Sequence, residues 1–318
     1  MNRREFLAGG AVVGAAAMCG AARAEGACCR LGMPKLAFPE QPAQLNLCLQ
    51  WWGIPVQDDI NAKLDYLEKN NYQAVEIPSG KWVLENGQKL FEALKGRKLF
   101  LSTACGPSRF DRADKAGNDK EVESFFPVLE VLGAIKAIGL IICPARGKPE
   151  IGLKELREDF VTNTGKRLAE KAAACGTSIV LEPLQRAETP FLRQVSDGAK
   201  MAQEIGPGCT VMGDFWHMSK EEPSPFAAFV SAGKLLSHVH IASLGRRKIP
   251  GSDGALDNYV DGFKGLKFLG YRGAVSLEAG FLPKGKNDKG KDIYPDNAEK
   301  HVILQRMCAL IREQWDMA

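Results

Sequence analysis

Short apolar runs alternate with longer stretches of helical periodicity from about residue 45 to the C-terminus. The runs are almost continuously apolar, which is typical of parallel strands that are buried on both faces. Between them, apolar residues recur at helical spacing, as at Ile60, Leu64 and Leu67, where Asp58 or Asp59 would cap the helix. The pattern predicts eight strands, at residues 45–49, 74–77, 99–103, 140–143, 178–182, 210–214, 236–241 and 274–278.

Eight strand-then-helix units predict an α/β fold, a single (β/α)8 TIM barrel over residues 45–318. The alternative is an open doubly wound sheet, which would bind a nucleotide at a glycine-rich first turn. The first turn here reads Trp-Trp-Gly-Ile-Pro from residue 51 and lacks that signature. The barrel is therefore favoured.

The N-terminus has the order of an export signal. Paired arginines at positions 3 and 4 precede an apolar, Ala/Gly-rich run, and Ala22-Arg23-Ala24 then offers a small-x-small cleavage site. The paired arginines resemble the twin-arginine signal, and the apolar run is shorter than the roughly 20 residues of a membrane span. We expect residues 1–24 to be a signal peptide and residues 25–44 a linker. The precursor would then meet the twin-arginine export machinery, and the product would be periplasmic or otherwise exported.

Charge and cysteine content add two expectations. The formal net charge is only +4, without a block of six like charges, so the sequence gives no indication of nucleic-acid binding. None of the nine cysteines has zinc-ribbon spacing. Cys48, Cys143 and Cys209 lie in or beside apolar runs, where single cysteines act as small hydrophobic residues. We expect mostly free, buried thiols.

Ligand-type residues gather at the ends of the last four runs, as Glu182, Asp214, His240 and Glu278. The carboxyl ends of barrel strands share one face, and a buried charge costs several kcal/mol unless it is paired or bound to a cation. Each residue alone has a structural explanation, as an ion-pair partner or a core histidine, but four on consecutive strands favour a metal site. Three carboxylates and one imidazole suit one divalent ion, Mn²⁺, Mg²⁺ or Co²⁺, better than structural Zn²⁺, which is not excluded.

These motifs resemble the sugar phosphate isomerase/epimerase superfamily with the xylose isomerase-like TIM barrel, which includes ketose 3-epimerases and hydroxypyruvate isomerase. The resemblance is strongest over residues 178–278. It rests on Glu182 in Leu-Glu-Pro-Leu, Asp214 and His217 in Asp-x-x-His-Met, His240 in His-x-His, Arg246 ahead of Pro250-Gly251, the strand-end Glu278, and Glu188 six residues after Glu182.

The resemblance implies a metal-dependent isomerase or epimerase that acts on a keto sugar or a related hydroxy-carbonyl compound through an enediolate. Glu182 and Glu278 would be the catalytic carboxylates as well as metal ligands. Two bases on opposite faces of the substrate give epimerisation, whereas one base that moves a proton between neighbouring carbons gives isomerisation. Glu188, His217 and Arg246 would contact the substrate.

Three other functions stay open. A metal-dependent lyase or hydrolase of keto-glycosides would use the same chemistry and expel a substituent. An endonuclease IV-like phosphodiesterase needs extra histidines from early strands, and this chain has none there. A non-catalytic sugar-binding barrel would not need all four ligands. A homo-oligomer is also compatible with the sequence.

Some weaker signals complete the picture. Arg186, Arg246 and Arg247 indicate either a phosphorylated or acidic substrate or ordinary ion pairs at the rim. Glu76 would contact the substrate or, as we favour, pair with a lysine. The polar segments 109–121 and 281–295 are expected to be surface loops near the pocket mouth.

Overall fold

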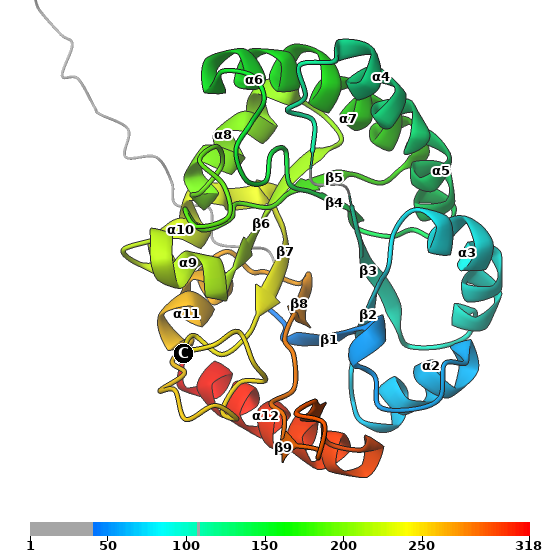
Figure 1. The fold of residues 1–318 in the computed structure, drawn as a ribbon, viewed down its shortest axis with the longest axis vertical. Coiled ribbons are helices and arrows are strands. Elements are labelled where there is room, and N and C mark those ends of the chain that lie inside the picture. Colours follow the sequence, from blue (N-terminus) through cyan, green and yellow to red (C-terminus); the bar gives the residue numbers. More distant parts are fainter. Residues whose placement is uncertain (1–40, 107–108) are drawn as a thin grey trace, which may run out of the picture. The chain divides into compact units, whose positions relative to one another are not determined.

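The computed structural model describes residues 41–106 and 109–318. In this part of the chain, eight parallel strands follow one another in sequence order and close into a barrel between β8 and β1 (Figure 1), which confirms the predicted TIM barrel. Each strand lies within two residues of its predicted bounds. The strands are β1 (Asn46–Gln50), β2 (Ala74–Ile77), β3 (Phe100–Cys105), β4 (Gly139–Ile142), β5 (Ile179–Leu181), β6 (Cys209–Asp214), β7 (Leu236–Ile241) and β8 (Ala274–Leu277).

Helices surround the barrel as an outer ring (Figure 1). A short 3-10 turn, η1 (Trp51–Gly53), follows β1, a π-helical segment, η2 (Phe160–Thr164), joins α6 to α7, and a second 3-10 turn, η3 (Gly233–Leu235), precedes β7. The α-helices are α2 (Ile60–Lys69), α3 (Lys81–Leu94), α4 (Lys115–Ser124), α5 (Phe126–Ala134), α6 (Leu153–Asp159), α7 (Gly165–Cys175), α8 (Val195–Ile205), α9 (Phe215–Glu221), α10 (Pro225–Ala232), α11 (Val260–Phe268) and α12 (Asn297–Met317).

Burial explains why the apolar pattern gives these elements. Every residue of β2, β4 and β8 is buried, because the barrel interior covers one face of each strand and helices cover the other. Helix α2 buries Leu64 and Leu67, as its spacing predicts, and Asp59 caps it by accepting a hydrogen bond from the Ala62 amide at 2.8 Å. Helix α12 begins with a capping box between Asp296 and Glu299.

The two segments expected to be surface loops are more ordered than predicted. Residues 109–121 run into helix α4, which buries only Asn118 and Val122 and therefore has little apolar periodicity. Residues 281–295 contain a small antiparallel hairpin of β9 (Gly285–Lys286) and β10 (Asp292–Ile293), both exposed. The loop prediction missed the helix and the short hairpin because neither element contributes an apolar face to the core.

The cysteines of the described residues are all free thiols, as predicted, and four of the six are buried. Cys28, Cys29 and the predicted signal peptide, residues 1–24, lie outside the described residues, as does most of the predicted linker. Within residues 41–106 and 109–318, none of the helices combines the length and apolar character needed to cross a bilayer.

Candidate active site

The four predicted ligands lie together at the carboxyl ends of four adjacent strands. Glu182 follows β5, Asp214 ends β6, His240 lies near the end of β7, and Glu278 follows β8. One ligand atom from each residue can be chosen so that all four atoms lie within 4.8 Å of one another. Strand register produces this grouping, because β6 pairs with β7 so that Asp214 lies opposite His240.

Backbone and side-chain contacts fix the orientation of the acidic ligands. Asp214 is the N-cap of α9, where its Oδ1 accepts a hydrogen bond from the Trp216 amide at 2.8 Å. Its Oδ2 is left to face the cluster. The Cys143 thiol donates to Oε2 of Glu182 at 3.2 Å, which leaves Oε1 of Glu182 for the same space. Each carboxylate is therefore held by one oxygen and offers the other.

Several polar atoms of the cluster are buried without a hydrogen-bond partner in the described part of the chain. They are Oε1 of Glu182, Nδ1 of His240 and Nε2 of His217. Oε1 of Glu182 lies 3.8 Å from Nδ1 of His240 and 3.9 Å from Nε2 of His217, so the three atoms border one space. Nδ1 of His240 is also 2.8 Å from Oε2 of Glu278, although the two are not aligned as a hydrogen bond. A cation would satisfy the buried lone pairs of Glu182 Oε1 and His240 Nδ1, and the residues therefore fit a divalent metal ion.

Electrostatics in the cluster agree with a cation site. Burial would raise the pKa of Glu278, but the charges of His240 and Arg247 outweigh it and lower that pKa to about 2. Burial would lower the pKa of His240, but the carboxylates of Glu76 and Glu278 hold it well above its usual value. Burial raises the pKa of Asp214. The raised pKa of His240 and the guanidinium of Arg247 therefore offset part of the negative charge of the carboxylates.

Two of the predicted substrate-contacting residues border the ligand cluster. His217 is buried, and its Nδ1 accepts a hydrogen bond from the Gln185 amide at 3.1 Å. A neutral His217 must therefore carry its proton on Nε2, which lies 3.5 Å from Oδ2 of Asp214 and faces the cluster as a donor. Glu188 accepts hydrogen bonds from Arg146 and from Gln185.

The third predicted substrate contact, Arg246, is not brought to the cluster. Its side chain is exposed, and its backbone amide donates to Asp253 at 3.0 Å. The next residue reaches the cluster instead: Nη2 of Arg247 lies 2.6 Å from Oε2 of Glu278 and 3.1 Å from Oδ2 of Asp214. Arg247 has a φ of 55°, a left-handed backbone conformation that is uncommon outside glycine, and no local pattern in the sequence indicates it.

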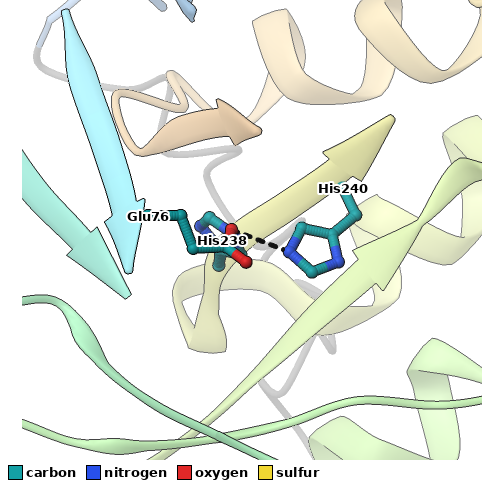
Figure 2. A group of neighbouring side chains, drawn as sticks. All are labelled: Glu76, His238 and His240. Carbon is teal, nitrogen blue, oxygen red and sulfur yellow. Dashed lines mark hydrogen bonds and ion pairs between the residues drawn. The ribbon is translucent and has the colours of Figure 1, made fainter. Parts of the chain in front are cut away.

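Glu76 has a different partner from the one predicted. It pairs with His238 and His240 of β7 across the barrel interior rather than with a lysine (Figure 2). Its partners lie 162 and 164 residues further along the chain, so no local pattern in the sequence could have identified them. The sequence indicated only that an acidic residue, Glu76, lies within an apolar run that is expected to be buried.

The sequence and the fold are similar to those of known proteins. Residues 64–298 match the family model described as xylose isomerase-like TIM barrel. The chain is 29% identical over 235 residues to a 3-dehydro-D-guloside 4-epimerase of Escherichia coli (strain K12), covering 70% of this chain and 87% of that protein. It is 30% identical over 182 residues to an L-ribulose 3-epimerase of Methylomonas sp. (strain DH-1), covering 57% of this chain and 62% of that protein, less than two thirds of its length.

Solved structures show the same fold. The 3-keto-D-glucoside 4-epimerase from E. coli, in its apo form, superposes with a TM-score of 0.71 at 24% identity, over 85% of this chain and 100% of that chain. A D-psicose 3-epimerase crystallised in the presence of D-fructose gives a TM-score of 0.70 at 19% identity, over 86% and 99% of the two chains. The predicted isomerase or epimerase class is confirmed: the chain belongs to the xylose isomerase-like TIM barrel family and is an enzyme of the sugar isomerase and epimerase type.

Proposed function

We propose that this enzyme is a divalent-metal-dependent epimerase of an unphosphorylated keto sugar, either free or within a glycoside. One observation carries the proposal: the carboxylates of Glu182 and Glu278 converge with Asp214 and His240 on one buried space that is bordered by unsatisfied polar atoms. Three relatives of similar sequence are named as epimerases of 3-dehydro-D-guloside, L-ribulose and D-psicose.

The donor set favours a hard divalent ion. Three carboxylate oxygens and one imidazole nitrogen are available, and no cysteine belongs to the four-residue cluster. Such a set suits Mn²⁺, Mg²⁺ or Co²⁺, whereas thiolate-rich sets favour structural Zn²⁺. When bound, the ion supplies Lewis-acid stabilisation for the negative charge that develops on the substrate's carbonyl oxygen.

Proton transfer is the task of the two glutamates. Glu182 follows β5 and Glu278 follows β8, so two strands separate them around the barrel and they approach a substrate from different sides. One carboxylate takes the proton from the carbon next to the carbonyl, and the other, protonated, returns a proton to the opposite face of that carbon. The configuration of the carbon is thereby inverted with no net change in atoms or electrons.

Three further side chains would bind substrate oxygens. His217 presents its Nε2–H to the cluster, and Arg247 presents Nη2 between two of the acidic ligands. Glu188, held by Arg146, can accept a hydrogen bond from a substrate hydroxyl. Because these donors and acceptors are already fixed by neighbouring residues, they need little reorganisation when the substrate binds.

Charge pairing at the same face favours a neutral substrate. Arg146 pairs with Glu188, Arg186 with Glu221, and Arg247 with two acidic residues of the cluster. Arginine holds both carboxylates and phosphates through bidentate hydrogen bonds, so a guanidinium that is already paired with a carboxylate is less available to a phosphate. Two of the three arginines that raised the possibility of a phosphorylated substrate, Arg186 and Arg247, are therefore better explained as ion-pair partners.

The test is to incubate the metal-loaded enzyme with a panel of ketoses and 3-keto-glycosides in D₂O. Deuterium at the inverted carbon without bond cleavage is the expected result. Release of an aglycone would instead identify the keto-glycoside lyase or hydrolase, which shares the first proton abstraction. The absence of exchange with every member of the panel, with the metal bound, would contradict the proposal.

We also propose that the chain is exported by the twin-arginine route to the periplasm or an equivalent compartment. The support is the sequence alone, namely the paired Arg3 and Arg4 before a short apolar run. Exchange of both arginines for lysine is expected to retain the protein in the cytoplasm, as measured by cell fractionation. Unchanged export of this variant would contradict the twin-arginine assignment.

A further inference from the structure

A fully buried carboxylate, Glu76 at the end of β2, has no part in the proton transfer described above. Its Oε2 accepts hydrogen bonds from Nε2 of His238 at 3.0 Å and from Nε2 of His240 at 2.9 Å. Its Oε1 accepts from the side-chain Nε2 of Gln50 at 2.8 Å and from the Cys105 thiol at 3.3 Å. Figure 2 shows the carboxylate directed at the two rings of β7. Four donors thus surround a side chain that acts only as an acceptor, which offsets the cost of burying its charge.

The contact with Glu76 determines which nitrogen of His240 can bind a metal. Nε2 of His240 faces Glu76, whereas Nδ1 faces the cluster, 2.8 Å from Glu278 and 3.8 Å from Glu182. A neutral imidazole has one N–H and one lone pair. Once Nε2–H is committed to Glu76, the lone pair must lie on Nδ1, on the side of the cluster.

We infer that Glu76 is a positioning residue for the metal ligand His240: it fixes the ring's tautomer and orientation so that the Nδ1 lone pair points at the metal site. The inference rests on the proposed function, because it needs a metal at the four-residue cluster. A carboxylate behind a ligating imidazole also raises the basicity of the ligand, and loss of such a partner typically costs 10–100-fold in metal affinity.

The same residues could be interpreted as a second metal site, since Glu76, His238 and His240 offer ligand atoms close to one another. The geometry opposes that interpretation. A metal held there by Nε2 of both histidines would require the proton of a neutral His240 to lie on Nδ1, and this would remove His240 from the four-residue cluster. Oε2 of Glu76 also lies 2.9–3.0 Å from both nitrogens, which is an ordinary hydrogen-bond distance. The two assignments therefore predict opposite tautomers.

The first test needs no variant. Protein labelled with ¹⁵N-histidine and loaded with the diamagnetic ion Mg²⁺ is examined by long-range ¹H–¹⁵N correlation NMR. We expect His240 to carry its proton on Nε2 and to lack one on Nδ1. The opposite tautomer overturns the inference, as does the binding of two ions per chain in a titration that detects free Mn²⁺ by EPR.

The second test compares Glu76→Gln with Cys105→Ala in the same Mn²⁺ titration. The glutamine keeps the shape of Glu76 but removes its charge and one acceptor oxygen, so Mn²⁺ binding should weaken by about 10–100-fold. Cys105→Ala removes a contact to the other oxygen of Glu76 and leaves the bond to His240 intact, and it should bind Mn²⁺ as the unaltered protein does. Near-UV circular dichroism of the metal-free proteins checks the fold.

The outcomes separate this inference from the proposed function. Failure of the unaltered protein to bind Mn²⁺ overturns the proposed function, and the role of Glu76 with it. Equal Mn²⁺ affinity in Glu76→Gln and the unaltered protein overturns only the role of Glu76. If Glu76→Gln does not fold, the tautomer measured in the unaltered protein decides the question by itself.

Discussion

Exchange of Arg247 for alanine, with Arg246→Ala as its control, tests the interpretation of two neighbouring arginines. Arg247 contacts Glu278 at 2.6 Å and Asp214 at 3.1 Å, and its side chain is 24% exposed. Arg246 is exposed, and its backbone amide donates a hydrogen bond to Asp253. An alanine at this position would keep that hydrogen bond. The two variants therefore remove the same charge from adjacent positions and differ in whether the cluster loses a contact.

The size of the effect follows from the geometry. Two unit charges about 3 Å apart attract each other by about 5 kcal/mol at an effective dielectric constant of ~20. Desolvation and solvent screening offset much of this, and hydrogen bonds to charged groups contribute about 1.5–3 kcal/mol net. If about 2 kcal/mol of the lost interaction is with the transition state, kcat/KM of Arg247→Ala falls about 30-fold. Arg246→Ala should retain the kcat/KM of the unaltered enzyme.

Metal affinity should change in the opposite direction. Arg247 is a fixed positive charge beside Oδ2 of Asp214 and Oε2 of Glu278, so its removal leaves the acidic residues freer to attract a cation. Arg247→Ala should therefore bind Mn²⁺ more tightly while it turns over substrate more slowly. Steady-state kinetics at saturating metal and a Mn²⁺ titration measure the two effects. A larger loss of kcat/KM in Arg246→Ala than in Arg247→Ala, or weaker Mn²⁺ binding by Arg247→Ala, would refute the reasoning.

Three further predictions concern catalysis, pH and stability. Glu182→Gln and Glu278→Gln should each lower kcat by at least about 100-fold with an unchanged circular dichroism spectrum, and a fully active Glu278→Gln enzyme would rule out the two-base scheme. Because the pKa of His240 is raised, a proton competes with the metal ion for its ring over a wider pH range, so Mn²⁺ affinity should rise with pH and fall on acidification. Calorimetry in buffers of different ionisation enthalpy would count the displaced protons, and a pH-independent affinity between about pH 6 and 8 would contradict the assignment. Asp296→Ala removes the N-cap of α12 and should cost about 1 kcal/mol of unfolding free energy in denaturant titrations, against no change for the exposed Asp288→Ala.

The barrel was predictable because burial on both faces makes each strand an apolar run. Even the short β5 is recognisable from three consecutive apolar residues. Helix α4 was missed because it buries only Asn118 and Val122, so its sequence has almost no helical apolar period. The β9–β10 hairpin was missed for a related reason. Both strands are exposed, so their sequences contain no apolar pattern from which a strand could be predicted.

The cluster was predictable where it depends on strand register, and unpredictable where it depends on loop conformation or distant contacts. Glu182, Asp214, His240 and Glu278 meet because parallel strands bring their carboxyl ends to one face. The choice between Arg246 and Arg247 depends on a positive φ in the loop after β7, which the residue types do not encode.

The contacts of Glu76 depend on distance along the chain. They join β2 to β7 across the barrel interior, and spacing within a sequence carries no information about such pairs. The sequence therefore shows that Glu76 is an acidic residue within a buried strand, and only the folded structure shows that His238 and His240 are its partners.

Asp214 occupies two structural roles at once, since one carboxylate oxygen caps α9 and the other faces the ligand cluster. The first turn of α9 also carries His217, so a metal ligand and a substrate donor share one short, rigid segment. A displacement of Asp214 would therefore also displace the start of α9 and, with it, the imidazole of His217. The position of the ligand Asp214 and the position of the donor His217 are therefore set by the same helix start.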